Sequence, residues 1–201
     1  MEVIPLRKRN VFASNCYIII SEKEFSVIDP SVSYGDALMQ IPKLKDLKPI
    51  AVLLTHAHID HIFEIDSYVN IGMQVFVSLE DADKLSDRMK NAAYLFGENL
   101  SGYFGKYNIL GDDIAVGNET LSVIKTPGHT SGSVCFLGDG ILFSGDTLFE
   151  NTYGRYDLYS GSREEIFASL RMVFKLSDDI TVYPGHAGVS TIRKIKHNFD
   201  N

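Results

Sequence analysis

Four side chains that commonly bind metals stand within six residues of one another: His56, His58, Asp60 and His61. Imidazole and carboxylate ligands suit zinc, iron or manganese, whereas structural zinc sites usually rely on cysteine. The chain has six histidines, and half of them lie in this short stretch. A His-x-His-x-Asp-His pattern arises by chance in roughly a few in ten thousand chains of this length. The pattern therefore predicts a metal site rather than a polar turn.

The spacing within this stretch indicates how the ligands divide. An apolar run at 50–54, typical of a β-strand, comes directly before it. Residues two apart on an extended chain point the same way, so His56 and His58 can hold one ion together. Asp60 and His61 fall where a helix would begin, and they face a different point. One short loop can therefore serve two ions. A helical His-Glu-x-x-His protease site has another spacing, which excludes that class.

Three more candidate ligands follow strand-like runs elsewhere in the chain. His129 and His186 each come directly after a Pro-Gly dipeptide, which favours a sharp turn and leaves the imidazole at the mouth of a strand. Asp146 follows a glycine at the end of the apolar run 141–144. Two metal sites need ligands from several parts of a fold, so we expect these residues to join the first cluster. His197 lies in a polar C-terminal tail and is expected to be a solvated surface residue.

These residues, in this order, resemble the motifs of the metallo-β-lactamase superfamily, and the resemblance covers residues 11–199. Within the superfamily the chain is most similar to the glyoxalase II-like hydrolases. Their Gly-Asp-Thr-Leu-Phe motif matches residues 145–149, and their Gly-Arg-x-Asp motif matches residues 154–157. Glyoxalase II continues into a helical domain that holds glutathione, whereas this chain ends 15 residues after His186. The resemblance therefore leaves the exact substrate open.

The resemblance also implies a role for each candidate residue. The first metal ion would be held by His56, His58 and His129 (the first group). The second would be held by Asp60, His61 and His186 (the second group), and Asp146 would bridge the two ions. Two divalent ions, zinc with iron or manganese as alternatives, are the implied cofactors. Asp60 and Asp146 are the implied catalytic residues. Asp29 is implied to lie behind the ligands, where a carboxylate fixes the tautomer and orientation of a ligating imidazole.

The implied activity is hydrolysis of a thioester such as S-lactoylglutathione by a metal-bridging hydroxide. A leaving thiolate has a pKa of about 8.5 and needs little assistance from an acid. Two alternatives stay open, a mononuclear iron persulfide dioxygenase that uses the first group alone and a hydrolase of lactones or other esters. Arg155 is a candidate for binding a substrate carboxylate, and pairing with Asp157 is its structural alternative. A non-enzymatic zinc module is disfavoured, because both cysteines lie outside the motifs.

The elements that must position these residues point to one α/β domain spanning residues 1–201, with 45% hydrophobic residues. Strand-like runs occur at 15–20, 25–29, 50–54, 74–78, 121–125, 134–137, 141–144 and 181–183. A helix is expected after Ser162, because Glu165 completes a capping box and an apolar face follows. Helices outside two sheets give a four-layer αββα sandwich, the fold that the resemblance implies. The segment 80–110 is the least regular part, and it is either a loop pinned by its own aromatic residues or a lid over the metals.

Charge and composition limit the partners. The net charge of −7 argues against nucleic acid, which demands a basic surface, and the basic runs at 7–9 and 193–196 are expected to be solvated. No segment is apolar and long enough for a signal peptide or a membrane span, so a cytoplasmic enzyme with a small-molecule substrate is expected. Cys16 and Cys135 lie in apolar runs and are expected to be buried and unpaired. The oligomeric state stays open.

Overall fold

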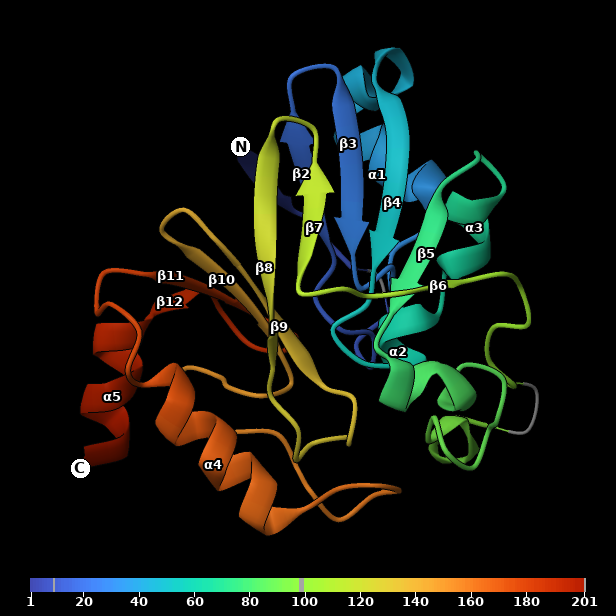
Figure 1. Cartoon of the computed structure of the whole chain (residues 1–201). Coiled ribbons are helices and arrows are strands. Elements are labelled where there is room, and N and C mark those ends of the chain that lie inside the picture. Colours follow the sequence, from blue (N-terminus) through green and yellow to red (C-terminus); the bar gives the residue numbers. More distant parts are fainter. Residues whose placement is uncertain (9, 98–99, 201) are drawn as a thin grey trace.

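The apolar runs of the sequence form strands whose ends lie within two residues of the expected ones. A computed structural model describes residues 1–8, 10–97 and 100–200. The strands form two mixed sheets that pack face to face, with helices on their outer sides (Figure 1). The four-layer αββα sandwich is thereby confirmed.

The first sheet carries the N-terminal half of the chain in simple sequence order. Its strands are β1 (Glu2–Pro5), β2 (Tyr17–Ser21), β3 (Glu24–Ile28), β4 (Lys48–Leu53), β5 (Gln74–Val77) and β6 (Asn108–Ile109). The first three strands pair antiparallel, and β3 to β6 pair parallel. Parallel pairs need crossover connections, and these supply the helices that cover the outer face of this sheet.

The second sheet carries the C-terminal half in the order β12-β11-β10-β9-β8-β7. Its strands are β7 (Asp113–Val116), β8 (Glu119–Lys125), β9 (Val134–Gly138), β10 (Ile141–Gly145), β11 (Thr181–Pro184) and β12 (Ser190–Thr191). Only β10 and β11 are parallel among these pairs. As a result, β8, β10 and β11 all run in the same direction and end at the same edge.

The helices divide between the two outer layers. The structure has α1 (Tyr34–Gln40), α2 (Ile59–Ile62), α3 (Ile65–Val69), α4 (Arg163–Val173) and α5 (Ile192–Asp200), with 3₁₀ helices η1 (Pro42–Asp46), η2 (Leu79–Lys84) and η3 (Ala93–Leu95). The predicted cap of α4 is present, since the Ser162 hydroxyl accepts a hydrogen bond from the Glu165 amide at 3.3 Å. Such caps stabilise a helix by about 1 kcal/mol.

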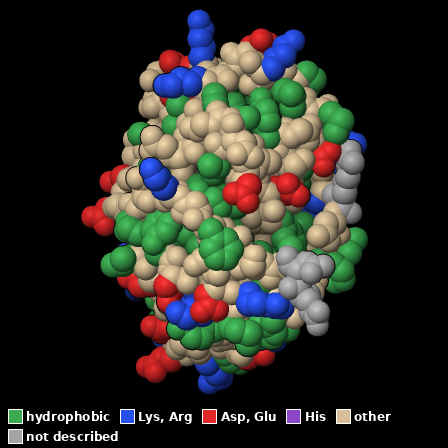
Figure 2. All heavy atoms as spheres, turned by 90° about the vertical axis from the view of Figure 1, so that its right-hand side faces the viewer, with side chains coloured by type: hydrophobic (Ala, Val, Ile, Leu, Met, Phe, Trp, Pro, Cys, Tyr) green, Lys and Arg blue, Asp and Glu red, His purple; other side chains and the backbone are tan. Residues whose placement is uncertain are grey.

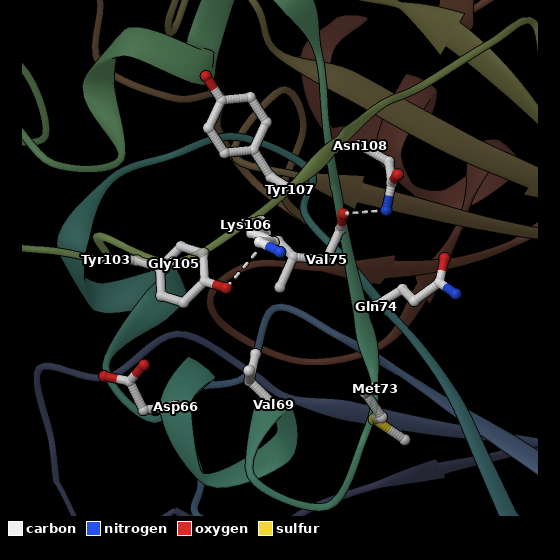
Figure 3. Close-up of a pocket in the computed structure, with 10 residues that line it drawn as sticks. All are labelled: Asp66, Val69, Met73, Gln74, Val75, Tyr103, Gly105, Lys106, Tyr107 and Asn108. Atoms are coloured by element: carbon white, nitrogen blue, oxygen red, sulfur yellow. Dashed lines mark hydrogen bonds between the residues drawn. The ribbon is translucent and has the colours of Figure 1, made fainter.

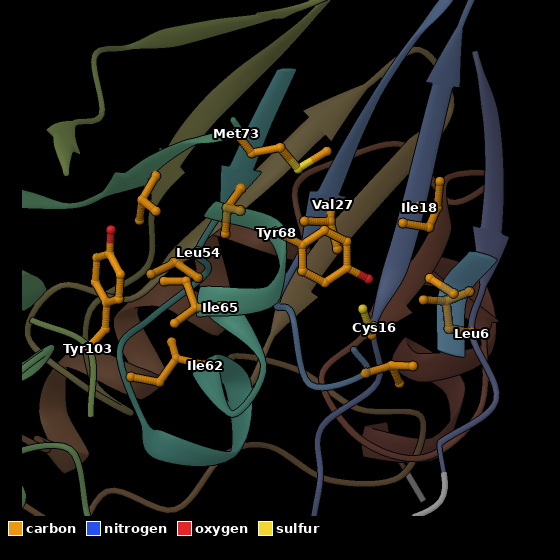
Figure 4. Packing of buried hydrophobic residues seen from close by; sticks show 14 of the residues in the cluster. Leu6, Cys16, Ile18, Val27, Leu54, Ile62, Ile65, Tyr68, Met73 and Tyr103 are labelled. Carbon is orange, nitrogen blue, oxygen red and sulfur yellow. The ribbon is translucent and has the colours of Figure 1, made fainter. Parts of the chain in front are cut away.

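The continuous apolar runs are explained by burial of both faces of a strand. In β2, Ile18 and Ile20 point to the helices of the outer layer, whereas Tyr17 and Ile19 point to the space between the sheets. Figure 4 shows the outer cluster, where Tyr68 of α3 lies beside Val27 of β3, and Ile18 of β2 lies further along the same face of the sheet. Since successive side chains of a strand point to opposite faces, a strand buried on both sides needs no polar alternation.

The expectation for the C-terminal residues needs correction. The predicted polar C-terminal tail is the helix α5, whose residues Ile192 and Ile195 are buried against the second sheet. His197 is exposed on this helix, as expected. In α5 the two buried isoleucines stand among charged residues, so the sequence has no apolar run there that would predict a helix. The segment 80–110 has little regular structure, as expected, with most of η2, η3 and the two-residue strand β6 in its described part, and Tyr103 in it is buried.

The surface shows no segregation of charge on the side that carries α3, β5 and β6. There, Lys and Arg side chains are scattered among acidic and apolar ones (Figure 2). Within the described ranges, every helix is too short or too polar to cross a bilayer. Cys16 and Cys135 are buried free thiols, as predicted.

Candidate metal centre

The candidate ligands meet where the strands of both sheets end. His56 follows β4, His129 follows β8, Asp146 follows β10 and His186 follows β11. The candidate ligands form three overlapping groups, and within each group the potential ligand atoms lie within 4.8 Å of one another. The groups are His56, His58 and His129; His56, His61 and Asp146; and Asp60, His61 and His186. The structure therefore brings all seven predicted ligands into one cluster.

The first group consists of three buried imidazoles. Nδ1 of His58 lies 2.8 Å from Nε2 of His129, which lies 3.2 Å from Nε2 of His56. Two nitrogens bound to one tetrahedral zinc, each at about 2.05 Å, would be separated by about 3.4 Å. The separation of 3.2 Å is close to that value and the one of 2.8 Å is shorter, so the three nitrogens already converge on one point.

The second group shares an aspartate with the first. Nε2 of His186 lies 3.1 Å from Oδ2 of Asp60. Asp146 directs Oδ1 to Nε2 of His61 at 3.2 Å, and Oδ2 lies 3.6 Å from Nε2 of both His129 and His186. One carboxylate thus touches both groups, which is the geometry of a bridging ligand.

Asp29 determines which ring nitrogen of His61 faces the cluster. Its carboxylate accepts from Nδ1 of His61 at 2.8 Å, and it also accepts from the amide and the hydroxyl of Thr55 at 2.8 and 2.7 Å. With a proton held on Nδ1, Nε2 of His61 is the nitrogen that remains for a metal ion, and it points at Asp146. Asp29 is buried, so it does not face the substrate itself.

Two further histidines are oriented in the same way. The Thr55 hydroxyl donates to Asp29, so its oxygen is free to accept from Nδ1 of His56 at 3.2 Å. The backbone carbonyl of Arg155 accepts from Nδ1 of His129 at 2.6 Å. Both rings therefore direct an unprotonated Nε2 into the cluster. Such partners behind the ligands fix tautomer and orientation in metal sites.

The cluster fits a pair of cations better than it fits hydrogen bonding alone. Nε2 of His61 and Oδ1 of Asp146 are buried without a hydrogen-bond partner in the described structure. Lone pairs that face one another repel unless a proton or a metal ion lies between them. Gly185 is required beside them, because a Cβ there would lie 2.1 Å from Oδ1 of Asp146. The donor set of imidazole and carboxylate suits zinc and iron.

Burial and neighbouring charges shift the pKa values of the histidines in opposite directions. Burial holds the pKa of His56 well below its usual range and lowers the pKa of His58 to about 3. Burial also opposes protonation of His61, but Asp29, Asp146 and Asp60 surround it and raise its pKa well above the usual range. His56 and His58 are therefore neutral and ready to bind a cation, whereas the carboxylates around His61 favour a positive charge there, either a proton or a metal ion.

Sequence reasoning missed Asp81, which ties the two histidine loops together. This buried carboxylate accepts from the Ala57 amide at 2.9 Å, from the Thr130 hydroxyl at 2.9 Å and from the Gly132 amide at 3.0 Å. It also pairs with the buried Lys84 at 2.7 Å. Ala57 lies between His56 and His58, and Thr130 follows His129. In the sequence Asp81 resembles its acidic neighbours, and only the tertiary contacts distinguish it.

Two basic residues differ in how the structure uses them. Arg155 forms two hydrogen bonds with Asp157, at 2.7 and 2.8 Å, and both side chains are more than half exposed. The structural alternative for Arg155 is the one observed. Lys8 was expected to be solvated, but it is half-buried and donates to the Ala13 carbonyl at 2.6 Å. Arg9, from the same basic run, lies outside the described residues.

The segment 80–110 contacts both ends of α2, the helix that carries Asp60 and His61. Phe96 packs edge-on against Phe63 at 5.7 Å and Phe12 at 6.2 Å between ring centroids, while Tyr94 and Leu95 remain exposed. Residues 98 and 99 of this segment lie outside the described ranges. The segment is thus pinned by aromatic contacts and also offers apolar side chains to solvent.

One cavity of the described structure is separate from the cluster. It measures about 750 Å³ and lies between α3, β5 and the segment 103–108 (Figure 3). Its lining includes Asp66, Met73 and Tyr107, and no candidate ligand belongs to it.

Comparison with known proteins places the chain in a family. The family model described as the metallo-beta-lactamase superfamily matches residues 9–186. The probable polyketide biosynthesis zinc-dependent hydrolase PksB of Bacillus subtilis is 32% identical over 192 residues, which cover 92% of this chain and 79% of PksB. The hydroxyacylglutathione hydrolase GloC of Haemophilus influenzae is 29% identical over 206 residues, 98% of this chain and 95% of GloC.

Solved structures agree over nearly the whole length. The crystal structure of the BLEG-1 B3 metallo-beta-lactamase has a TM-score of 0.86 at 32% identity and covers 98% of this chain and 97% of its own. The crystal structure of TTHA1623 in a di-iron-bound form has a TM-score of 0.84 at 27% identity, covering 97% and 98%. With its fold, its histidine and aspartate cluster and these matches, the chain belongs to the metallo-β-lactamase superfamily of metal-dependent hydrolases.

Proposed function

We propose that this protein is a binuclear, zinc-dependent thioester hydrolase that cleaves small acyl thioesters such as S-lactoylglutathione. The observation that carries the proposal is the position of Asp146, whose two oxygens lie against the ligand atoms of both groups. A carboxylate placed between two groups of ligands can bind one ion with each oxygen, as in binuclear metal sites. The similarity to GloC, a hydroxyacylglutathione hydrolase, supports the choice of a thioester.

The residues would divide the work as follows. His56, His58 and His129 would hold one ion, Asp60, His61 and His186 the other, and Asp146 both. When bound, the two ions would supply a hydroxide nucleophile at neutral pH and polarise the substrate carbonyl. Asp60 is nearly buried and would accept a hydrogen bond from the attacking water, which orients it. Asp29 and the Arg155 carbonyl would keep the protons of His61 and His129 away from the centre.

A thioester suits such a centre because the leaving group is a good one. A thiol has a pKa of about 8.5, so the thiolate can depart near neutral pH without a dedicated acid. An alcohol leaving group is more basic and gains more from protonation. This difference favours thioesters over the lactones and other esters that superfamily chemistry also allows.

The proposal is tested by following loss of thioester absorbance of S-lactoylglutathione with purified, chelator-stripped and zinc-reconstituted protein. We expect turnover that disappears on stripping and returns with zinc. His186→Ala should lower turnover at least 100-fold, since it removes a ligand, and the matched change His197→Ala should leave turnover unchanged. Full activity of the stripped protein would contradict the proposal.

One observation favours the persulfide dioxygenase as a second candidate. The three-histidine group is buried and complete without the second group, in which His186 is 36% exposed. Protein that carries a single iron and consumes oxygen with a glutathione persulfide, without thioester turnover, would replace the first proposal by this one.

A further inference from the structure

The described residues between β1 and β2, 6–8 and 10–16, contact both ligand loops of the second group. A hydrogen bond from the Leu6 amide to the Cys16 carbonyl, at 2.9 Å, closes the base of this connection. The Ser14 amide donates to the Asp60 carbonyl at 3.2 Å, and the Asn15 amide donates to the Gly185 carbonyl at 2.6 Å. This connection therefore forms one wall of the metal centre.

Lys8 lies on this wall, and its ammonium is fastened to the stretch of chain that contacts Asp60. Nζ donates to the Ala13 carbonyl at 2.6 Å, one residue before Ser14, whose amide binds Asp60. Burial lowers the pKa of Lys8, and the charges of Asp60 and Asp146 act in the opposite direction. The charges of Asp60 and Asp146 therefore favour the ammonium form of Lys8, although neither carboxylate forms an ion pair with it.

The charge of Lys8 is not neutralised by the described part of the chain. Lys84 pairs with Asp81, Lys90 with Asp83 and Arg155 with Asp157. Lys8 has no carboxylate at ion-pair distance among residues 1–8, 10–97 and 100–200. An ammonium has three donors, and the Ala13 carbonyl uses one of them. A partly buried cation with free donors beside a reaction centre is a suitable place for an anion.

The tip of the same wall is apolar. Val11 is 82% exposed and Phe12 is 67% exposed, and the Phe12 ring packs edge-on against Phe96. A ligand at the centre would therefore meet an apolar rim with a cation on its inner side. That combination suits a thioester that carries a carboxylate on a short, partly apolar chain.

We propose that Lys8 binds a carboxylate of the substrate beside the metal centre and selects anionic thioesters over neutral ones. This inference rests on the proposed hydrolase function and adds a specificity residue to it. Arg155, whose guanidinium is bonded to Asp157, would contribute less to this selection. The competing explanation is structural, in which Lys8 only fastens the wall through Ala13.

The two explanations are separated by a pair of substrates with the same acyl group. S-lactoylglutathione carries carboxylates, whereas the thioester S-lactoyl-N-acetylcysteamine is neutral. Lys8→Met should raise KM for the first about 10- to 100-fold, the usual range for losing a hydrogen bond to a charged group, and leave the second within about threefold. Lys8→Arg should restore the preference. Equal losses on both substrates, or no loss on either, would overturn the inference.

The matched control is Lys45→Met, which makes the same change of charge at an exposed position in η1, ahead of β4 and away from the ligand end of that strand. It should change neither KM. Thermal unfolding of both variants checks that the wall stays folded.

A binding measurement keeps the inference testable if the wild-type protein hydrolyses neither thioester. Calorimetric titration of zinc-loaded protein with S-hexylglutathione and with neutral N-acetyl-S-hexylcysteamine measures anion selection without turnover. Tighter binding of the anionic ligand, lost in Lys8→Met, would support Lys8 while the thioesterase proposal fails. Equal binding of the two ligands by the wild-type protein would overturn the role of Lys8.

Discussion

At the scale of single residues, the centre depends on partners that never touch the metals. Asp29 receives three hydrogen bonds, from the His61 ring and from the Thr55 amide and hydroxyl, and Thr55 in turn faces His56. One carboxylate therefore orients a ligand of each group. Its backbone has φ of +50°, a conformation that asparagine also tolerates well.

Asp29→Asn should weaken zinc binding about 10- to 100-fold, because an amide cannot accept from every donor that the carboxylate satisfies. Competition with a chromophoric chelator measures this change. Asp139→Asn, at an exposed position in the turn between β9 and β10, is the matched control and should leave affinity unchanged. Wild-type affinity in Asp29→Asn would show that the imidazoles are oriented by other contacts.

The two cysteines are predicted to be inert in the native protein. Both are fully buried, and burial raises the pKa of Cys16 to about 12 and that of Cys135 to about 11. At pH 8 about one thiol in a thousand or fewer would be ionised. A thiol-reactive dye should therefore label neither cysteine within minutes before denaturation and both after it. Rapid labelling of the folded protein would contradict the burial described here.

At the scale of elements, η2 and the two histidine loops form one polar unit. Asp81, from η2, bonds to the loop after β4 and to the loop after β8, while Lys84 neutralises it. Lys84 also donates to the Ser131 hydroxyl at 3.1 Å. The two sheets are bonded at the same place, since the Val134 amide donates to the Thr55 carbonyl at 2.8 Å. These contacts fix the loop that carries His56 and His58 relative to the loop that carries His129.

Asp81→Ala should lower the free energy of unfolding by about 3–5 kcal/mol, because it leaves Lys84 buried without its counter-charge. Urea denaturation of the protein measures this loss. Asp83→Ala is the matched control, since Asp83 is 57% exposed and pairs with Lys90 on the surface, and it should cost less than about 1 kcal/mol. Equal effects of the two changes would mean that the buried pair has no special role.

The sequence predicts the ligand loops, but not all the residues and strands that hold them in place. The His-x-His-x-Asp-His loop and the Pro-Gly-His turns are local signals, so their residues can be found without the fold. Asp81 and Lys8 carry no such signal, because their roles arise from contacts with residues far along the chain or across a turn. Strands β6 and β12 have two residues each and exist because neighbouring strands offer hydrogen bonds. Such edges have too little pattern of their own to be predicted.

At the scale of the whole molecule, the centre lies on the seam between two halves. The first sheet supplies the loop with His56, His58, Asp60 and His61, and the second supplies His129, Asp146 and His186. Tyr17 of the first sheet donates to the Pro184 carbonyl of the second at 2.6 Å, and Tyr17 and Phe143 pack between the sheets. Long apolar runs predict two buried sheets, but their mutual orientation depends on this packing, which no single segment encodes.

The most direct test of this account is the metal content of the folded protein, measured by mass spectrometry after zinc loading and gel filtration. We predict two ions per chain in the wild type. Removing one ligand from each group separately, by His58→Ala and by His186→Ala, should leave about one ion, and His197→Ala should retain two. A wild-type content of one ion, or an unchanged content of two in both ligand variants, would contradict a binuclear centre built from these residues.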